Sequence, residues 1–241
     1  MLISPLALTA TVGLVISTTA SAGAVVINNG SFETNSLSDW TSTGVTTVTD
    51  ANFGTTASAG DFHALLETDA STTGVNASAL ESFLNLPTAS LTNSNRGVDE
   101  GSAIKQTITA KAGDVLSFDW NFLTEEPSNS PNNDFALFTV AGSFDQLADT
   151  SSPFLAFSYT VFPNETGYQT KTYQIPIDGT YILGFGVADV NNSNINSALL
   201  IDNVSLSESN PTPVPWEFSP GMGLILLAGW GAIAQLKSRV C

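Results

Sequence analysis

The 241-residue chain is poor in cysteine, histidine and positive charge. Its one cysteine is the last residue, Cys241, which excludes an intramolecular disulfide. Its one histidine, His63, is too few for a zinc site built from several histidines or cysteines. There is no Gly-x-Ser-x-Gly motif for a nucleophilic serine and no glycine-rich phosphate loop. Catalysis has little support, and a glycoside hydrolase that uses two carboxylates remains the enzyme alternative.

Positive charge is scarce relative to negative charge. Six Lys and Arg residues stand against 22 Asp and Glu residues, which gives a formal net charge of −16. Such a chain repels nucleic-acid phosphates, so we exclude a nucleic-acid partner. The acidity is explained either by plain solubility or by the binding of cations.

Short runs of alternating apolar and polar residues fill most of the chain and are typical of β-strands. The clearest run places Leu116, Phe118 and Trp120 on one face of a strand. We expect strands at residues 24–28, 45–49, 63–67, 103–109, 115–124, 134–141, 154–161, 169–175, 180–190 and 198–206. Many strands without long helices predict two packed antiparallel sheets.

One short helix is predicted over residues 78–86. Asn76 or Ser78 can cap its N-terminus, and Pro87 stops it. Trp120 lies in the most apolar row, which favours a place in the core over a role in sugar stacking, and Trp40 is also interpreted as a packing residue.

The two ends of the chain differ from the middle. Residues 1–22 are typical of a secretory signal peptide, with an apolar stretch at residues 6–16 and a small-residue cleavage site at residues 20–22, although the stretch before it lacks Lys and Arg. The alternative is a buried N-terminal strand or helix. We assign residues 23–207 to one β domain and residues 208–217 to a Pro-rich linker.

An uncharged, mostly apolar segment follows at residues 218–236, and residues 237–241 form a basic end. The segment is close to the length that crosses a bilayer, and we predict a transmembrane helix rather than a soluble amphipathic helix because it has no charged face. Lys237 and Arg239 would stay in the cytoplasm, which leaves the β domain outside.

Pro215, Trp216 and Glu217, followed by the apolar segment and the basic end, resemble the PEP-CTERM class of C-terminal sorting signals in a form seen in cyanobacterial proteins. Trp216 interrupts the Pro-Glu-Pro core of that class. The resemblance implies recognition by an exosortase, a membrane peptidase, and delivery to the cell surface or the exopolysaccharide matrix.

The start and end of the β domain carry a second resemblance. Residues 26–33 read Val-Ile-Asn-Asn-Gly-Ser-Phe-Glu, and residues 199–206 read Leu-Leu-Ile-Asp-Asn-Val-Ser-Leu. These sequences resemble jelly-roll, galactose-binding-like modules found among carbohydrate-binding families. The resemblance implies an all-β jelly-roll sandwich and a structural calcium ion with Glu33 and Asp202 as its side-chain ligands.

The residues also support a cation at Asp202 without the resemblance. By period two, Asp202 shares a face with the apolar residues Leu200 and Val204. A carboxylate in an apolar row needs a partner, and Ca²⁺ takes oxygen ligands. The alternatives are that this face is exposed, or that backbone N–H groups of a loop satisfy the carboxylate.

A second acidic cluster contains Glu125, Glu126 and Asp134. Several oxygen donors could converge there on a metal, and the alternative is an ordinary polar hairpin loop. The sequence therefore predicts a non-catalytic, exported surface or matrix protein, with exosortase and exopolysaccharide as its expected partners. The first alternative is a carbohydrate-binding module.

Overall fold

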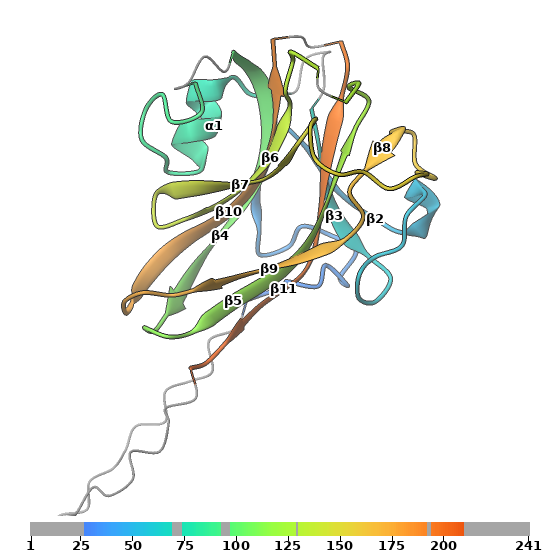
Figure 1. Cartoon of the computed structure of the whole chain (residues 1–241). Coiled ribbons are helices and arrows are strands. Elements are labelled where there is room, and N and C mark those ends of the chain that lie inside the picture. Colours follow the sequence, from blue (N-terminus) through green and yellow to red (C-terminus); the bar gives the residue numbers. More distant parts are fainter. Residues whose placement is uncertain (1–26, 69–73, 93–96, 129, 192–193, 210–241) are drawn as a thin grey trace, which may run out of the picture.

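The structure, a computed structural model, describes residues 27–68, 74–92, 97–128, 130–191 and 194–209. They form two antiparallel sheets packed face to face (Figure 1). The predicted signal peptide lies outside the described residues, as do Pro215, Trp216, Glu217, Lys237 and Arg239. Within the described part of the chain, no helix is long and apolar enough to cross a membrane.

Each sheet is built from strands that are distant in the sequence. The first sheet has the order β1 (Thr41–Thr43), β4 (Val98–Ala110), β10 (Gly179–Val190), β6 (Phe135–Val140) and β7 (Ser143–Asp149). The second has the order β2 (Val45–Thr49), β3 (His63–Glu67), β11 (Ser197–Ser207) and β5 (Val115–Thr124); β8 (Asn164–Glu165) and β9 (Gln169–Gln174) both pair with β5.

The chain crosses repeatedly between the sheets in the pattern of a jelly roll. β3 lies in the second sheet, β4 in the first, β5 in the second, β6 and β7 in the first, β9 in the second, β10 in the first and β11 in the second. The order β3-β11-β5-β9 therefore faces β4-β10-β6-β7. This confirms the predicted all-β, antiparallel jelly-roll sandwich.

The core lies between the two sheets and is rich in aromatic rings. Phe118 and Trp120 of β5 point into it, as their period-two spacing predicts. Phe185 of β10 meets Phe118 at a centroid distance of 4.8 Å. Trp40 packs against Phe185 at 5.9 Å, and its Nε1 donates to the carbonyl of Asn29. Both tryptophans are therefore packing residues, as predicted.

Helix α1 (Ala77–Phe83) covers the outer face of the first sheet (Figure 1). Asn76 caps it, because its side chain accepts the N–H of Ala79 at 3.0 Å. The predicted end of the helix is wrong: the helix stops at Phe83, not residue 86, and Asn85 follows in the left-handed region at φ 56°.

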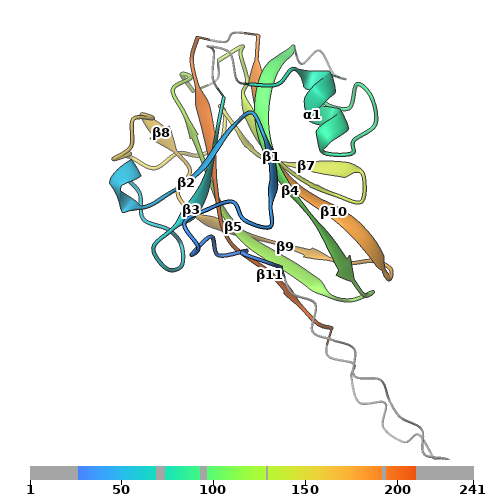
Figure 2. The same cartoon turned by 180° about the vertical axis from the view of Figure 1, so that it is seen from behind.

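Five expectations about the strands are also wrong. β1, β7 and β8 were not expected, and residues 27 and 28 of the first predicted strand are not in a strand. Residues 154–161 form no strand, although they alternate in the predicted way; Leu155 donates its N–H to the carbonyl of Glu165 in β8 at 2.8 Å. β1 is short and runs beside β4 (Figure 2), where three residues give too little periodicity to detect.

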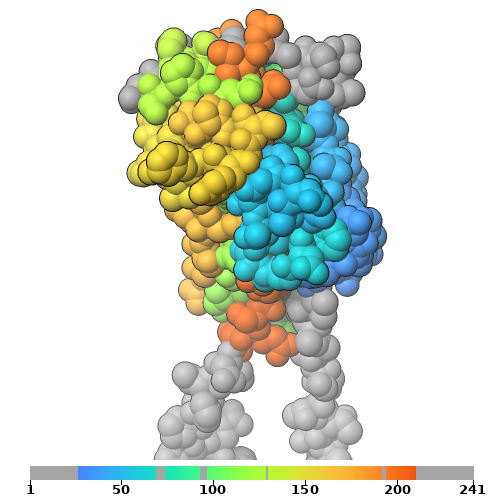
Figure 3. Space-filling view, turned by 90° about the vertical axis from the view of Figure 1, so that its right-hand side faces the viewer, coloured from blue at the N-terminus to red at the C-terminus, as the bar shows by residue number. Residues whose placement is uncertain are grey.

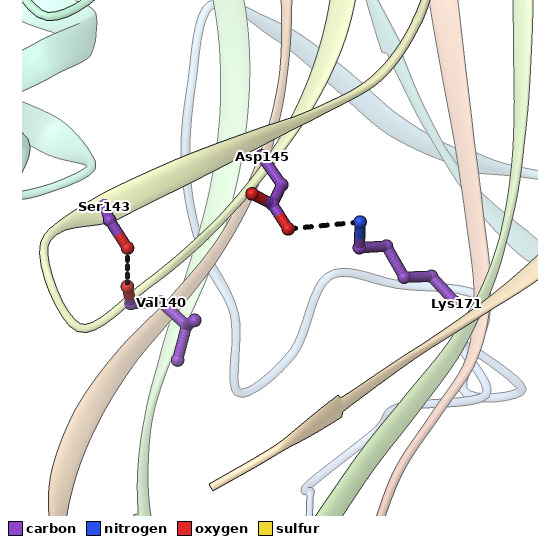
Figure 4. A network of polar contacts seen from close by, with 4 residues as sticks. All are labelled: Val140, Ser143, Asp145 and Lys171. Carbon is purple, nitrogen blue, oxygen red and sulfur yellow. Dashed lines mark hydrogen bonds and ion pairs between the residues drawn. The ribbon is translucent and has the colours of Figure 1, made fainter. Parts of the chain in front are cut away.

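The edges of the two sheets are joined by an ion pair. Lys171 Nζ of β9 lies 3.1 Å from Asp145 Oδ2 of β7 (Figure 4). At the start of β7, the Ser143 hydroxyl donates to the carbonyl of Val140 at 3.1 Å. The pair spans the open side of the sandwich, and its exposure limits its contribution to at most about 1 kcal/mol.

Candidate functional site

The outer face of the second sheet lies beneath two loops, residues 50–62 and 150–168, which meet over it (Figure 3). Phe53, at the end of the 3₁₀ turn Ala51–Phe53, packs against Phe162 of the second loop, with 6.3 Å between the ring centroids. Both rings pack on the apolar side chains that the sheet presents outward, among them Leu65, Leu123 and Leu200. The sheet, with its two loops, forms the base of the candidate site.

Asp202 lies on this outer face, which corrects one step of the sequence argument. A β-bulge at Asn203 (φ 51°) inserts an extra residue between Asp202 and Ser205 of β11. The bulge turns Val204 into the interior, whereas Leu200 and Asp202 face outward. Asp202 therefore does not share a face with Val204, because an irregular residue breaks the period of two.

Asp202 is paired directly across the ladder with another acid, Asp119 of β5. The hydroxyl of Ser58 lies 3.0 Å from Asp202 Oδ2 and 2.8 Å from Asp119 Oδ2. Asp202 also accepts the backbone N–H groups of Ala59 and Asn203. Burial raises the pKa of Asp202 more than these bonds lower it. For Asp119, hydrogen bonds from Thr170, Ser58 and Asn203 outweigh burial and lower the pKa.

Glu33 holds the same loop from the other side. Its carboxylate accepts the backbone N–H groups of Asp61 and Phe62, each at 3.0 Å. Gly60 passes so close that a Cβ there would stand 2.4 Å from Glu33 Oε1. The structure thus brings both predicted metal ligands to residues 58–62, where each accepts loop N–H groups. This is the arrangement that the sequence left open as the alternative to calcium for Asp202.

The second predicted cluster is divided. Glu125 is exposed and accepts the N–H of Asn196 at 3.2 Å, whereas Glu126 and Asp134 are buried. Asp134 accepts the hydroxyl of Ser197 and the N–H of Val190. Burial, together with the charge of Glu126, raises the pKa of Asp134 to about 7 despite these two bonds. Among the described residues, no three His, Cys, Asp or Glu side chains gather as a metal site would require.

His63 is fully buried beneath the two loops. Its Nδ1 lies 2.7 Å from the hydroxyl of Tyr168, and burial among carboxylates raises the pKa of Tyr168, so this hydroxyl stays protonated. One hydrogen bond thus joins the neutral hydroxyl to Nδ1, and the other ring nitrogen, Nε2, has no hydrogen-bond partner among the described residues. Burial lowers the pKa of His63 to about 4, although Asp50 opposes the shift. This histidine packs beneath both loops, against Phe53 of the first and Tyr168 of the second, and is not exposed to solvent.

The second loop exposes a row of apolar side chains, which we call the ridge: Leu155, Phe157, Tyr159 and Val161. Their exposed fractions are 53%, 78%, 85% and 76%, and Ile177 is the one other large hydrophobic residue exposed to this degree in the described chain. Exposed apolar side chains that cluster in this way mark binding surfaces. The loop that carries the ridge is the yellow segment of Figure 3, beside the loop around residues 50–60.

The backbone of the ridge is held by local hydrogen bonds and by the neighbouring loop. The hydroxyl of Ser158 accepts the N–H of Thr160, and the hydroxyl of Thr160 accepts the N–H of Phe162. Gly54, at φ 113°, lets the first loop approach the carbonyl of Tyr159, because a Cβ at this position would stand 2.4 Å from that oxygen. Local side-chain bonds and the neighbouring loop thus replace the ladder of a strand.

Charge is almost absent from the loop that carries the ridge. Between residues 151 and 168 the one charged side chain is Glu165, which is buried and accepts the side-chain amide of Asn121 at 3.0 Å. The sequence signal of the ridge was its apolar alternation, which we interpreted as a strand. Alternation cannot say whether the apolar side faces a core or solvent, and so sequence reasoning missed this surface.

A separate cavity of about 270 Å³ lies beside α1 and is lined by Ser78, Glu81, Ser82, Asn85, Leu86 and Thr88. Glu81, the one charged side chain among them, is buried and uses both oxygens to accept the N–H groups of Ala89 and Leu91. The carboxylate of this cavity therefore holds the segment that follows the helix.

No protein-family model matches this chain, and no curated protein matches it. Among solved structures it is similar to the module TmCBM61 in complex with β-1,4-galactotriose, with 14% identity, a TM-score of 0.42 and coverage of 76% of this chain and 97% of the other. It is also similar to a structure of promiscuous carbohydrate-binding modules of the β-sandwich superfamily, with 13% identity, a TM-score of 0.42 and coverage of 77% of this chain and 64% of the other. For the K1 adhesin domain of Lys-gingipain from Porphyromonas gingivalis W83, the identity is 10%, the TM-score is 0.40, and the coverage is 74% of this chain and 95% of the other. These values are too low to transfer a ligand or partner.

The two shifted groups predict opposite pH dependences. A folded-state pKa near 4 for His63, against 6.5 when unfolded, makes stability rise with pH between those values. A folded-state pKa near 7 for Asp134, against 3.8 when unfolded, makes stability fall as pH rises from 3.8 to about 7. In urea titrations at pH 5 and pH 7, we expect the unfolding free energy of His63→Gln relative to wild type to fall by about 2 kcal/mol as pH rises, and that of Asp134→Asn relative to wild type to rise by about 2 kcal/mol. Slopes of the same sign in the two variants would contradict these assignments.

Proposed function

We propose that this chain is a non-catalytic carbohydrate-binding β-sandwich and that the ridge is its binding surface. The observation that carries the proposal is the exposure of Phe157 and Tyr159 on a loop that local hydrogen bonds hold in place and whose one charged side chain, Glu165, is buried. The bound partner would be a polysaccharide of the surroundings, such as an exopolysaccharide.

Aromatic rings suit this role for a simple physical reason. One face of a pyranose ring presents C–H bonds, which carry partial positive charge, and the face of an aromatic ring is electron-rich. Stacking the two buries apolar area and leaves the sugar hydroxyls in water. Because local hydrogen bonds already hold the backbone of the loop, little backbone conformational entropy is lost when the sugar arrives.

The hydrolase alternative finds less support in this site. Such an enzyme needs a general acid and a second carboxylate on either side of the bond that it breaks. The loop of the ridge carries the single, buried carboxylate of Glu165. The pair Asp119 and Asp202 is buried and engaged with Ser58, so its hydrogen bonds serve the loop rather than a substrate.

The ridge predicts which side chains binding requires. We expect Phe157→Ala and Tyr159→Ala each to weaken binding to a recognised polysaccharide at least tenfold, about 1.4 kcal/mol, with an unchanged urea midpoint because both rings are exposed. Affinity electrophoresis of the full chain measures the change. Ile177→Ala is the matched control, since Ile177 is similarly exposed on another part of the domain. Equal retardation of all variants would remove the ridge from consideration.

We also propose a structural calcium ion at the loop of residues 58–62. Two carboxylates directly opposite one another repel, and the Ser58 hydroxyl has one proton to share between Asp119 and Asp202. The donors available to a cation are carboxylate and hydroxyl oxygens, which suit Ca²⁺. Glu33 and Asp202 would hold it, with backbone carbonyl oxygens completing the shell.

Chelation tests the calcium proposal. We expect EDTA to lower the thermal midpoint of the full chain and CaCl₂, but not MgCl₂, to restore it, because the loop then depends on a cation. The variant Asp202→Asn should lose the response, whereas Asp145→Asn, at an exposed ion pair, should keep it. A chain that contains no calcium and melts at the same temperature with EDTA would contradict the proposal.

Export and sorting complete the proposed role. Residues 1–22 would direct secretion, and residues 208–241 would present the chain to an exosortase-like peptidase and the membrane. Mass spectrometry of the protein recovered from the cell surface measures this directly. We expect peptides up to the region of Glu217 and none that contain Lys237 or Arg239. Recovery of the basic end would instead indicate a lasting anchor.

A further inference from the structure

We infer that the glycan recognised by the ridge is uncharged. This inference rests on the proposed function and adds the chemical class of the ligand. It follows from the distribution of charge over the described residues, not from the fold.

The ridge offers an acidic sugar no compensating charge. Uronic acids and sulfated sugars carry negative groups that binding sites neutralise with Lys or Arg, in charge-assisted hydrogen bonds. The loop from residue 151 to residue 168 contains neither. Its polar side chains Ser158 and Thr160 bond along the loop itself. The surface can therefore stack on a sugar but cannot neutralise a carboxylate.

The described lysines lie away from the ridge. Lys105 donates to the carbonyl of Phe83 at 2.6 Å and lies 4.3 Å above the ring of that residue, beneath α1. Lys171 pairs with Asp145. Lys111 precedes the start of β5, whereas β8, in the loop of the ridge, pairs with the other end of that strand. None of the three is placed to serve a ligand on the ridge.

The field of the whole protein acts in the same direction. A net charge of −16 repels anionic polymers, over a range of about 10 Å at 0.1 M salt. The same repulsion disfavours a second copy of this chain or an anionic membrane as the occupant of the ridge. A neutral polymer pays no such penalty and can use the apolar area fully.

Affinity electrophoresis of the full chain tests the inference, with gels that contain either neutral galactomannan or xyloglucan, or acidic alginate or polygalacturonate. We expect retardation by a neutral polymer, with an affinity at least tenfold higher than for either acidic polymer at low salt. Because no ion pair is involved, affinity for the neutral polymer should stay within twofold between 50 mM and 500 mM NaCl. Phe157→Ala should abolish the retardation. Val161→Lys, which adds a cation to the ridge, should raise the affinity for the acidic polymers.

The possible failures are distinguishable. Retardation by an acidic polymer at equal or higher affinity, lost in Phe157→Ala, would overturn the inference and leave carbohydrate binding by the ridge in place. Retardation that Phe157→Ala leaves unchanged would overturn both the ligand class and the proposed site. An absence of retardation by all four polymers would overturn both as well.

Discussion

The structure depends on how carboxylates are satisfied in a chain that has almost no cations. With 22 acidic and six basic residues, most carboxylates cannot form ion pairs, and they accept hydrogen bonds from backbone N–H groups and hydroxyls instead. Glu33 and Asp202 hold residues 58–62 in this way, and Glu81 holds the segment after α1. A hydrogen bond to a carboxylate is worth more than a neutral one, so each acid fixes a loop that has little apolar area of its own.

This arrangement connects the ends of the domain to the ridge. Glu33, near the start of the described chain, and Asp202, in the last strand, both bind the first loop. That loop in turn contacts the ridge through Gly54 and, next to the ridge, Phe162 through Phe53. A loop of residues 150–168 that lacked these neighbours would lose order, because its exposed side chains contribute no burial. The position of the loop that exposes Phe157 and Tyr159 thus depends on Glu33 and Asp202, which are far from them in the sequence.

Much of the fold could be predicted from the sequence because its signals are local and periodic. β2, β3 and β5 begin and end where the alternation of residues predicts. The pattern failed where one residue interrupts it: Asn203 in the left-handed region reverses the faces of β11 and moves Val204 inward. The predicted ligands Glu33 and Asp202 do meet at one loop, but Asp119 and Ser58 join them only through strand pairing and loop closure, which are not visible in a linear pattern. The exosortase signal and the membrane segment stay predictions.

Residues 154–161 show why such a surface escapes sequence analysis. They have the alternation and the β-propensity of a strand, yet a strand also needs a free edge to pair with. The edge of β5 is already occupied by β8 at Leu123 and Thr124 and by β9 from Val115 to Trp120. The segment therefore runs over the sheet instead of joining it, and Ser158 and Thr160 satisfy N–H groups that a neighbouring strand would have bonded. Phe162, which follows the segment, packs on the outer face of the sheet, while the residues of the ridge remain in solvent. Apolar side chains that cannot enter either core are costly in water unless a ligand covers them, and this is the physical basis for assigning them to binding.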